Sequence, residues 1–215
     1  RFAMGNDVAD INHDGWPDII SLDMLPENEK VLKSSEGADN VQTQKMRTER
    51  FGYHYQFSRN MLFINQQQGG FAETALLSGI AATDWSWSAL FADYDQDGKQ
   101  DIFISNGIAK RPNDLDYINF VSNQQIQKKI STTKLVDEQA LNLMPSGVVH
   151  NYVFKGSDDL KFEDKSKSWI SNDTLKSGAT AIADFDLDGH LDLVVLAYSD
   201  WKASDHKDCI GPAGI

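Results

Sequence analysis

Short runs of apolar residues alternate with polar loops along most of the 215-residue chain. Three of these runs, at residues 61–64, 89–92 and 102–105, are about four residues long and lie among residues such as Asp, Asn and Gly that favour turns. Runs of this length that end at turn-forming residues are typical of β-strands. The pattern predicts an all-β fold made of short strands.

The strand pattern also repeats along the chain. Asn60 precedes Asp93 by 33 residues, and Asn151 precedes Asp184 by the same interval, with apolar positions matching in between. Each unit is about 50 residues long and is expected to hold three or four strands. The predicted repeat units are residues 1–22, 59–108 and 150–199.

A single short all-β unit cannot bury its own faces, so neighbouring units must stack. Periodic units of this kind predict a β-propeller of four-stranded blades. We expect residues 1–215 to form a single partial β-propeller domain, an arc of a larger ring. Two insertions, 23–58 and 109–149, interrupt it. In the second insertion, Asp116 is predicted to cap a helix that runs to about Ile130. Thr133 is predicted to cap a second helix that runs to about Leu143.

Each repeat unit contains a nine-residue loop of the form Asp-x-(Asp/Asn)-x-Asp-Gly-x-x-Asp, flanked by strands. Ca²⁺ prefers six to eight oxygen ligands, which alternate positions of such a loop supply, while glycine at position 6 allows the sharp turn. The sequence therefore predicts three Ca²⁺ sites, with backbone carbonyls from Trp16, Lys99 and His190. The predicted ligands are Asp10, Asn12, Asp14, Trp16 and Asp18 in loop one; Asp93, Asp95, Asp97, Lys99 and Asp101 in loop two; and Asp184, Asp186, Asp188, His190 and Asp192 in loop three.

Three other interpretations of these loops fit the sequence less well. An EF-hand requires glutamate at position 12, where this chain has Ser21, Ile104 and Val195. Mg²⁺ prefers fewer protein ligands and octahedral geometry. Ordinary hairpin turns explain one Asp-Gly loop, but three copies that share four oxygen ligands favour calcium.

The charge distribution supports a metal-binding role. The chain has 32 acidic and 20 basic residues and a net charge of −12. Leaving out the eleven loop aspartates gives 21 acidic residues against 20 basic ones, so the excess acidity lies in the loops. No basic stripe predicts nucleic-acid binding, and no apolar run approaches the roughly 20 residues that span a bilayer.

The loops and their flanking strands resemble FG-GAP/VCBS repeats, the calcium-loop propeller repeats of integrin α subunits. Further segments resemble bacterial secreted relatives of cartilage acidic protein, which carry a seven-bladed propeller and an ASPIC/UnbV domain. The resemblance implies an exported protein that is extracellular or lies at the cell surface. At the cell surface, it would be anchored in the outer membrane through residues outside this sequence. The resembling segments are 21–26, 52–56, 59–62, 83–88, 106–108 and 111–116.

No catalytic motif such as Gly-x-Ser-x-Gly, His-Glu-x-x-His or Cys-x-x-Cys occurs in the sequence. We therefore expect a non-catalytic binding, adhesion or assembly module for a protein or glycan, within a larger surface assembly. The alternative is a polysaccharide-degrading lyase or hydrolase, or an accessory subunit of a glycan-uptake complex.

Trp85 and Trp87 share one face of a predicted strand, where they either fill the space between blades or form an exposed aromatic platform. In the second case the partner would bind on the insertion face. The candidate binding residues are Tyr53, Tyr55, Trp85, Trp87, Arg111 and Asn113.

Overall fold

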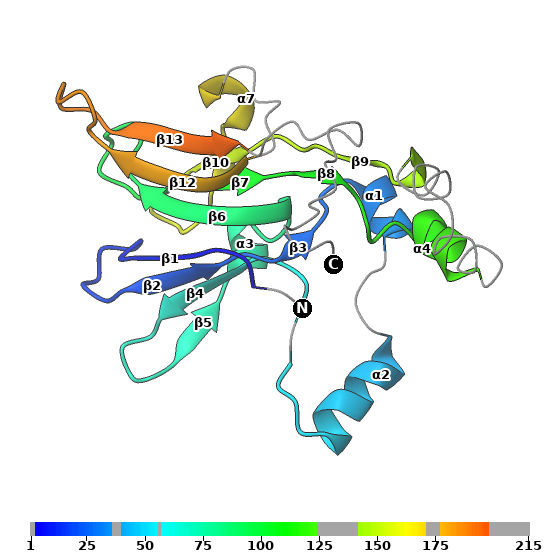
Figure 1. Cartoon of the computed structure of the whole chain (residues 1–215). Helices are drawn as coiled ribbons and strands as arrows, with labels where there is room; N and C mark the ends of the chain where they lie inside the picture. The colour runs from blue at the N-terminus through cyan, green and yellow to red at the C-terminus, as the bar shows by residue number, and fades with distance from the viewer. Residues whose placement is uncertain (1–2, 36–39, 56, 124–141, 171–176, 198–215) are drawn as a thin grey trace, which may run out of the picture.

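The structure, a computed structural model, describes residues 3–35, 40–55, 57–123, 142–170 and 177–197. Most of its regular structure is β-strand, and every strand pair among these residues is antiparallel. The structure is mostly β, as predicted, and its curled antiparallel sheets are consistent with a propeller fragment (Figure 1).

The first sheet has four strands in the order β1-β2-β4-β5. β1 (Asn6–Ala9) and β2 (Asp18–Ser21) form the hairpin that carries loop one. β4 (Met61–Asn65) pairs with β2, and β5 (Phe71–Glu73) closes the outer edge. The first insertion therefore connects two neighbouring strands of one sheet.

The second sheet repeats this arrangement with an extra edge strand. β6 (Asp84–Ala92) and β7 (Asp101–Asn106) carry loop two, followed by β10 (Tyr152–Lys155) and β11 (Glu163–Asp164). The extra strand, β3 (Met24–Leu25), comes from the first insertion and pairs with the start of β6.

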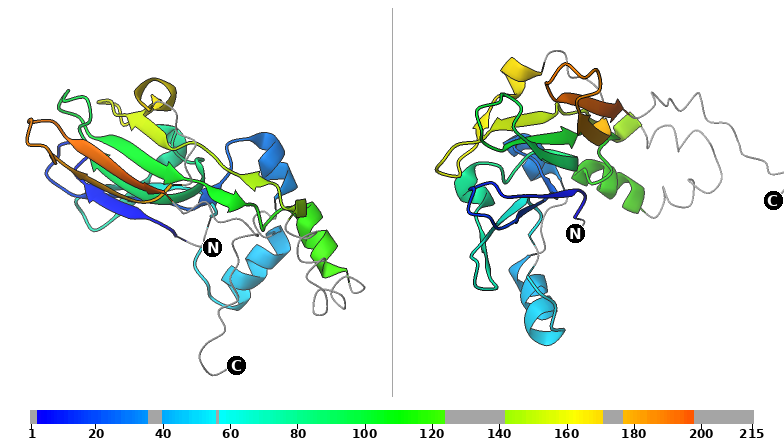
Figure 2. Two further views of the ribbon diagram at one scale, coloured as in Figure 1. Left: turned by 45° about the horizontal axis from the view of Figure 1, so that its top comes forward. Right: turned by 90° about the vertical axis from the view of Figure 1, so that its left-hand side faces the viewer.

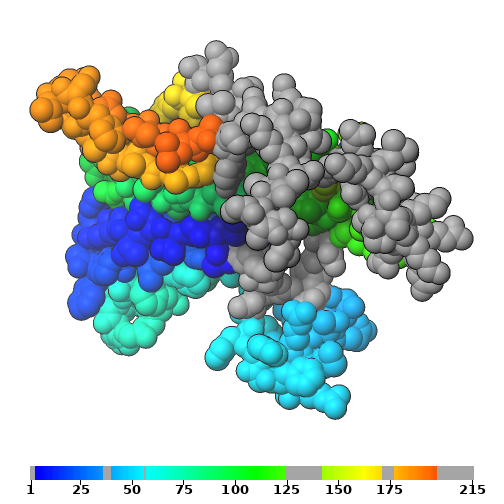
Figure 3. Space-filling view, viewed as in Figure 1, coloured from blue at the N-terminus to red at the C-terminus, as the bar shows by residue number. Residues whose placement is uncertain are grey.

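The third unit contributes one hairpin, β12 (Ser177–Ala183) and β13 (Asp192–Ala197), which carries loop three. Strands β1, β6 and β12 pack side by side, so the three hairpins form a stack whose loops lie at one end (Figures 1 and 2). The tips of the first and third hairpins project at the left of the space-filling view (Figure 3).

The sequence repeat and the sheets are out of phase. The unit 59–108 supplies β4 and β5 to the first sheet, but β6 and β7 to the second. The unit 150–199 is divided in the same way between the second sheet and the third hairpin. Each repeat thus joins two neighbouring sheets instead of folding into one.

Buried polar residues explain why asparagine recurs at the start of each unit. The Asn60 Oδ1 accepts the N–H of Asp23, and its Nδ2 donates to the Ile80 carbonyl at 3.0 Å. Asn151 accepts the N–H of Asn106 at 2.7 Å and donates to the Ser177 hydroxyl at 2.8 Å. Each asparagine therefore fixes the end of one hairpin against the approach to the next.

The main hydrophobic core lies between the first two sheets. It joins side chains from β2 and β4 to side chains from β6, β7 and β10. Direct hydrogen bonds also link the stacked hairpins: the Phe91 N–H donates to Asp7 Oδ2 at 2.7 Å, and the Ser105 hydroxyl donates to the Gly178 carbonyl at 2.6 Å.

Short helices α3 (Ala75–Ser78) and α7 (Ser166–Trp169) follow β5 and β11 at equivalent repeat positions. The first insertion contains α1 (Glu29–Ser34), α2 (Val41–Lys45) and the π-helical turn η1 (Met46–Arg50). These elements were not predicted individually from the sequence, because the segment has no sustained apolar period.

The second insertion begins with β8 (Ile108–Lys110), which pairs with β9 (Ser146–Gly147). Its helix α4 spans Leu115–Ser122, and here the sequence prediction was wrong at both ends. The cap is Asp114, whose extended backbone lets its carboxylate accept the N–H groups of Asp116 and Tyr117, both at 3.1 Å. The helix stops because Asn123 is extended, and the helix predicted to begin at Thr133 falls almost entirely outside the described residues.

Both insertions leave the sheets at the end opposite the three loops (Figures 1 and 2). Ser35 and Asp114 form an isolated β-bridge that connects them. The Tyr152 hydroxyl donates to Glu27 at 2.8 Å, which fixes the first insertion to the second sheet.

Candidate metal centre

The three loops have the same backbone conformation. Glycine at position 6 has φ of 84°, 86° and 90° in Gly15, Gly98 and Gly189, a region that side chains disfavour. Position 4 also has positive φ in every loop, at His13, Gln96 and Leu187. Three unrelated side chains in this conformation show that the loop geometry is imposed by the rest of the motif.

The first aspartate of each loop holds the turn together. Asp10 accepts the N–H of Asp14 at 3.0 Å with one oxygen and that of Gly15 at 2.8 Å with the other. Asp93 and Asp184 make the same pair of bonds in loops two and three, with distances of 2.8–3.1 Å. Each oxygen keeps a second lone pair that remains available to a cation.

The ninth position closes the loop and connects it to the sheet. Asp18 accepts the N–H of Ile11 at 3.0 Å and that of Asn65 at 2.8 Å. Asp101 accepts the N–H of Tyr94 at 3.0 Å and that of Gly156 at 2.8 Å. Both aspartates are fully buried, so each loop is fixed to the third strand of its sheet.

Carboxylate oxygens converge in two of the loops. Asp93, Asp95 and Asp101 each offer an oxygen within 4.8 Å of the others, as do Asp184, Asp186 and Asp188. An all-oxygen set on a tight loop fits the preference of Ca²⁺ for hard ligands. Loop one has Asn12 at position 3, whose amide donates to Asp14 at 3.3 Å.

The electrostatics of the loops favour a bound cation. Burial raises the pKa of Asp18 and of Asp101 above the usual aspartate range, and the charges of the other loop carboxylates add to that rise. At position 5 the pKa is lowered instead, by the backbone N–H of Trp16 at Asp14 and chiefly by the side chain of Lys155 at Asp97. A divalent ion would offset the repulsion that adds to the rise at Asp18 and Asp101.

Side chains at position 7 point to other partners, as expected if only the backbone carbonyl faces a metal. The Lys99 ammonium lies 3.1 Å from Asp158, and the His190 Nδ1 lies 3.0 Å from the Gln96 amide. Trp16 is 46% exposed.

The predicted partner-binding residues do not form one surface. Tyr53 and Tyr55 are 66% and 68% exposed in the segment after η1. Trp85 and Trp87 are half-buried, and the Trp87 Nε1 donates to the Gly107 carbonyl at 2.8 Å. Arg111 is 5% exposed.

Arg111 is instead a structural residue. Its guanidinium makes two hydrogen bonds to the buried carboxylate of Asp84, at 3.0 and 2.8 Å, and a third to the Ser146 carbonyl at 3.2 Å. Asn113, two residues further on, is half-buried, and its Oδ1 has no hydrogen-bond partner among the described residues. Arg111 was predicted to bind a partner because it lies in an insertion, but the position of a residue in an insertion does not indicate whether its side chain is buried.

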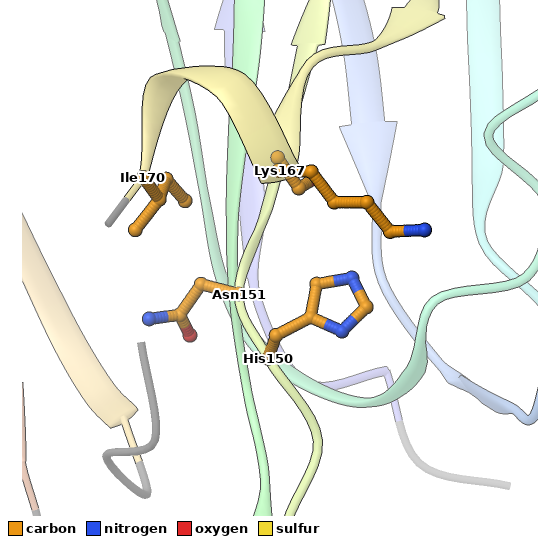
Figure 4. Close-up of a pocket in the computed structure, with 5 residues that line it drawn as sticks. His150, Asn151, Lys167 and Ile170 are labelled. Atoms are coloured by element: carbon orange, nitrogen blue, oxygen red, sulfur yellow. The ribbon is translucent and has the colours of Figure 1, made fainter. Parts of the chain in front are cut away.

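Two cavities border these regions. One, of about 270 Å³, is lined by Tyr55, Phe57 and Arg59 together with the outer face of β4. The other, of about 150 Å³, is lined by His150, Asn151, Ser166, Lys167 and Ile170. Figure 4 shows its His150 ring and Lys167 side chain extending on the same side, with Ile170 on the short helix above.

Two polar side chains of the second cavity, Asn151 and Ser166, have structural partners. Ser166 accepts the N–H of Val153 at 3.0 Å, and the Asn151 amide bonds to Asn106 and Ser177. The His150 ring packs on Tyr152 at 4.4 Å between centroids. These contacts stabilise the start of β10 and assemble no nucleophile with a base.

A comparison with models of protein families matches part of the chain. Residues 51–104 match the model of the FG-GAP-like repeat, which confirms the predicted repeat family for this segment. The matched residues run from the end of the first insertion through β4, β5, β6 and loop two into β7. None of the curated proteins compared with the chain matches it.

The matched residues include loop two and the strand β6 that precedes it. Among the described residues, no helix is long and apolar enough to cross a membrane.

Proposed function

We propose that this chain is a calcium-binding segment of a β-propeller in which each of the three loops holds one structural Ca²⁺. The observation that carries the proposal is the shared loop geometry: the same backbone turn and the same bonds from the first aspartate in all three copies. A turn needs no further carboxylates at positions 3 and 5, whereas a hard cation does.

The exposed faces of the stack support a propeller with further blades. Val8, Met61 and Phe63 on the first sheet occupy the repeat positions of Phe91, Tyr152 and Phe154 on the second. The second-sheet residues are at most 8% exposed, because they pack against the first sheet. Their first-sheet equivalents face outward, and Val8 is 54% exposed.

The opposite side of the stack has the same property. Val194 and Leu196 are 40% and 60% exposed, whereas the equivalent Phe103 and Ser105 are 1% and 0% exposed.

We propose that further four-stranded blades cover both faces, as in a seven-bladed ring. Residues 1–215 alone should then self-associate through these exposed apolar faces. Leu196→Lys places a charge on one of the faces and should reduce the self-association measured by sedimentation. A monomer that binds no hydrophobic dye contradicts the proposal.

For the whole domain we propose a non-catalytic role in binding or assembly outside the cell, which is the location implied by the resemblance to bacterial secreted relatives of cartilage acidic protein. The aromatic residues Tyr53 and Tyr55 supply the most exposed candidate surface, since aromatic side chains are enriched at binding hot spots. Tyr53→Ala with Tyr55→Ala should weaken retention on a glycan array or of a co-purifying protein. Phe71→Ala, an exposed aromatic on β5, is the matched control. Polysaccharide turnover by the purified chain would refute the non-catalytic reading.

Calcium binding is tested by melting the protein in calcium and in chelator. One site at 100 times its Kd contributes about 2.7 kcal/mol, roughly 5–10 °C in a domain of this size. The melting temperature should fall in chelator and recover with Ca²⁺ more than with Mg²⁺. Asp188→Ala should reduce the shift, while Asp158→Ala, outside the loops and 88% exposed in its side chain, should not. An unchanged melting curve at verified zero metal content contradicts the proposal.

A further inference from the structure

Loop two contains a cation that belongs to the protein itself. Lys155, the last residue of β10, places its Nζ 2.7 Å from Asp97 Oδ2 and also bonds to Asp95. These aspartates are positions 5 and 3 of the loop. All three side chains are about 30% exposed, so the ammonium is partly shielded among the oxygens that would bind the metal.

The other two loops lack this arrangement among the residues that the structure describes. In loop one, the position-5 carboxylate of Asp14 is bonded by the neutral amides of Gln67, at 3.2 Å, and Asn12. The first-sheet residue equivalent to Lys155 is Ile64, which is 4% exposed in the core. In loop three the His190 N–H donates to Asp188, and no described residue forms an ion pair with that carboxylate.

We infer that Lys155 is a built-in counter-ion that competes with Ca²⁺ and sets the affinity of loop two. The inference rests on the proposed calcium function. Without metal, the ammonium neutralises part of the repulsion among four carboxylates. When Ca²⁺ binds, the ammonium either leaves and gives up two ion pairs, or stays and repels a divalent ion. Both outcomes raise the Kd of loop two.

The expected effect is large enough to measure. Between unit charges about 4 Å apart, full screening by water still leaves roughly a fivefold effect on an equilibrium, and a doubly charged ion increases it. Removal of the Lys155 charge should therefore tighten Ca²⁺ binding at loop two by about tenfold.

Lys155 also affects how the three loops are expected to rank in Ca²⁺ affinity. Loop one offers three carboxylates and loop three offers four, while loop two offers four carboxylates with one ammonium. Loops one and two then have the same net charge of −3 against −4 for loop three. Loop three should hold its ion to the lowest free calcium concentration.

The experiment measures Ca²⁺ binding by calorimetry in the 215-residue chain, with loops one and three weakened by Asp14→Asn and Asp188→Asn. In this background Lys155→Met should lower the Kd of the remaining site about tenfold, while Lys155→Arg, which keeps the charge, should leave it within about twofold. Lys161→Met is the matched control, because that exposed ammonium lies outside the loop and pairs with Asp159.

A second measurement separates the inference from the calcium proposal. In chelator, Lys155→Met should melt below Lys155→Arg, because the carboxylates lose their counter-ion, and calcium should reverse that order. Equal Kd values for the methionine and arginine variants overturn the inference while leaving calcium binding intact. The absence of binding heat in all variants overturns the calcium proposal for loop two, and the competition with it.

Discussion

The buried pair of Asp84 and Arg111 provides the sharpest test of how the insertions are attached. Asp84 begins β6 with a positive φ of 68°, pairs with Leu25 of the first insertion, and receives two hydrogen bonds from Arg111 of the second. Both side chains are 6% exposed. Asp84 therefore joins both insertions to β6, the first through strand pairing and the second through the ion pair.

Removing either partner should be costly, because it leaves the other charge buried without compensation. Arg111→Met deletes three hydrogen bonds, and Asp84→Asn preserves the shape and tolerates the positive φ. A broken buried pair typically costs about 3–5 kcal/mol. At about 2–4 °C per kcal/mol for a domain of this size, the melting temperature should fall by roughly 6–20 °C.

The assay is denaturant unfolding at saturating calcium for both single variants and the double variant, together with hydrogen exchange of residues 108–123. The double variant should lose about as much stability as either single one, because the second substitution removes the charge left unpaired by the first. Exchange in residues 108–123 should rise in all three. Losses below about 1 kcal/mol that add in the double variant would show that the pair behaves as an exposed salt bridge and refute this reasoning.

Three further predictions concern single sites. Gly5→Ala should destabilise the stack by about 1–3 kcal/mol, because the new Cβ would lie 2.5 Å from the Trp87 carbonyl oxygen, whereas Gly70→Ala meets no atom within 4 Å; equal stability of the two in urea contradicts the close approach. Asn12→Asp adds a fourth carboxylate to loop one and should tighten Ca²⁺ binding there by calorimetry while lowering stability in chelator; unchanged affinity argues against position 3 as a ligand. Burial would raise the pKa of Glu73, but hydrogen bonds from Arg59 and from backbone N–H groups outweigh it and lower the pKa, so this stabilisation is present at neutral pH and disappears as pH falls below about 4.5. Stability curves of wild type and Glu73→Gln should converge in acid, and a constant gap down to pH 3 speaks against it.

The sequence was most informative where the chemistry is local. The nine-residue loops could be identified because ligand spacing, the glycine and the flanking strands all lie within about fifteen residues. The repeat family followed from the same local pattern and is confirmed for residues 51–104. The antiparallel hairpins around each loop follow from the same short spacing.

Features that depend on contacts between distant residues could not be predicted. Lys155 reaches Asp95 across 60 residues of sequence, and Arg111 reaches Asp84 across 27. The sequence does not reveal whether a given lysine or arginine side chain is exposed. The division of each repeat between two sheets was also invisible, because self-alignment identifies a period but not the partner of each strand.

That division of each repeat between two sheets has a consequence for folding during synthesis. The first sheet gains its last strand only at Glu73, and the second only at Asp164, although their hairpins end at Ser21 and Asn106. A nascent chain therefore exposes an unpaired hairpin edge until much of the next repeat has emerged from the ribosome. Unpaired edges promote association between chains. The 45 residues between β7 and β10, and the 39 residues between β2 and β4, lengthen this interval. Translation speed through the two insertions should therefore govern how much of the protein aggregates.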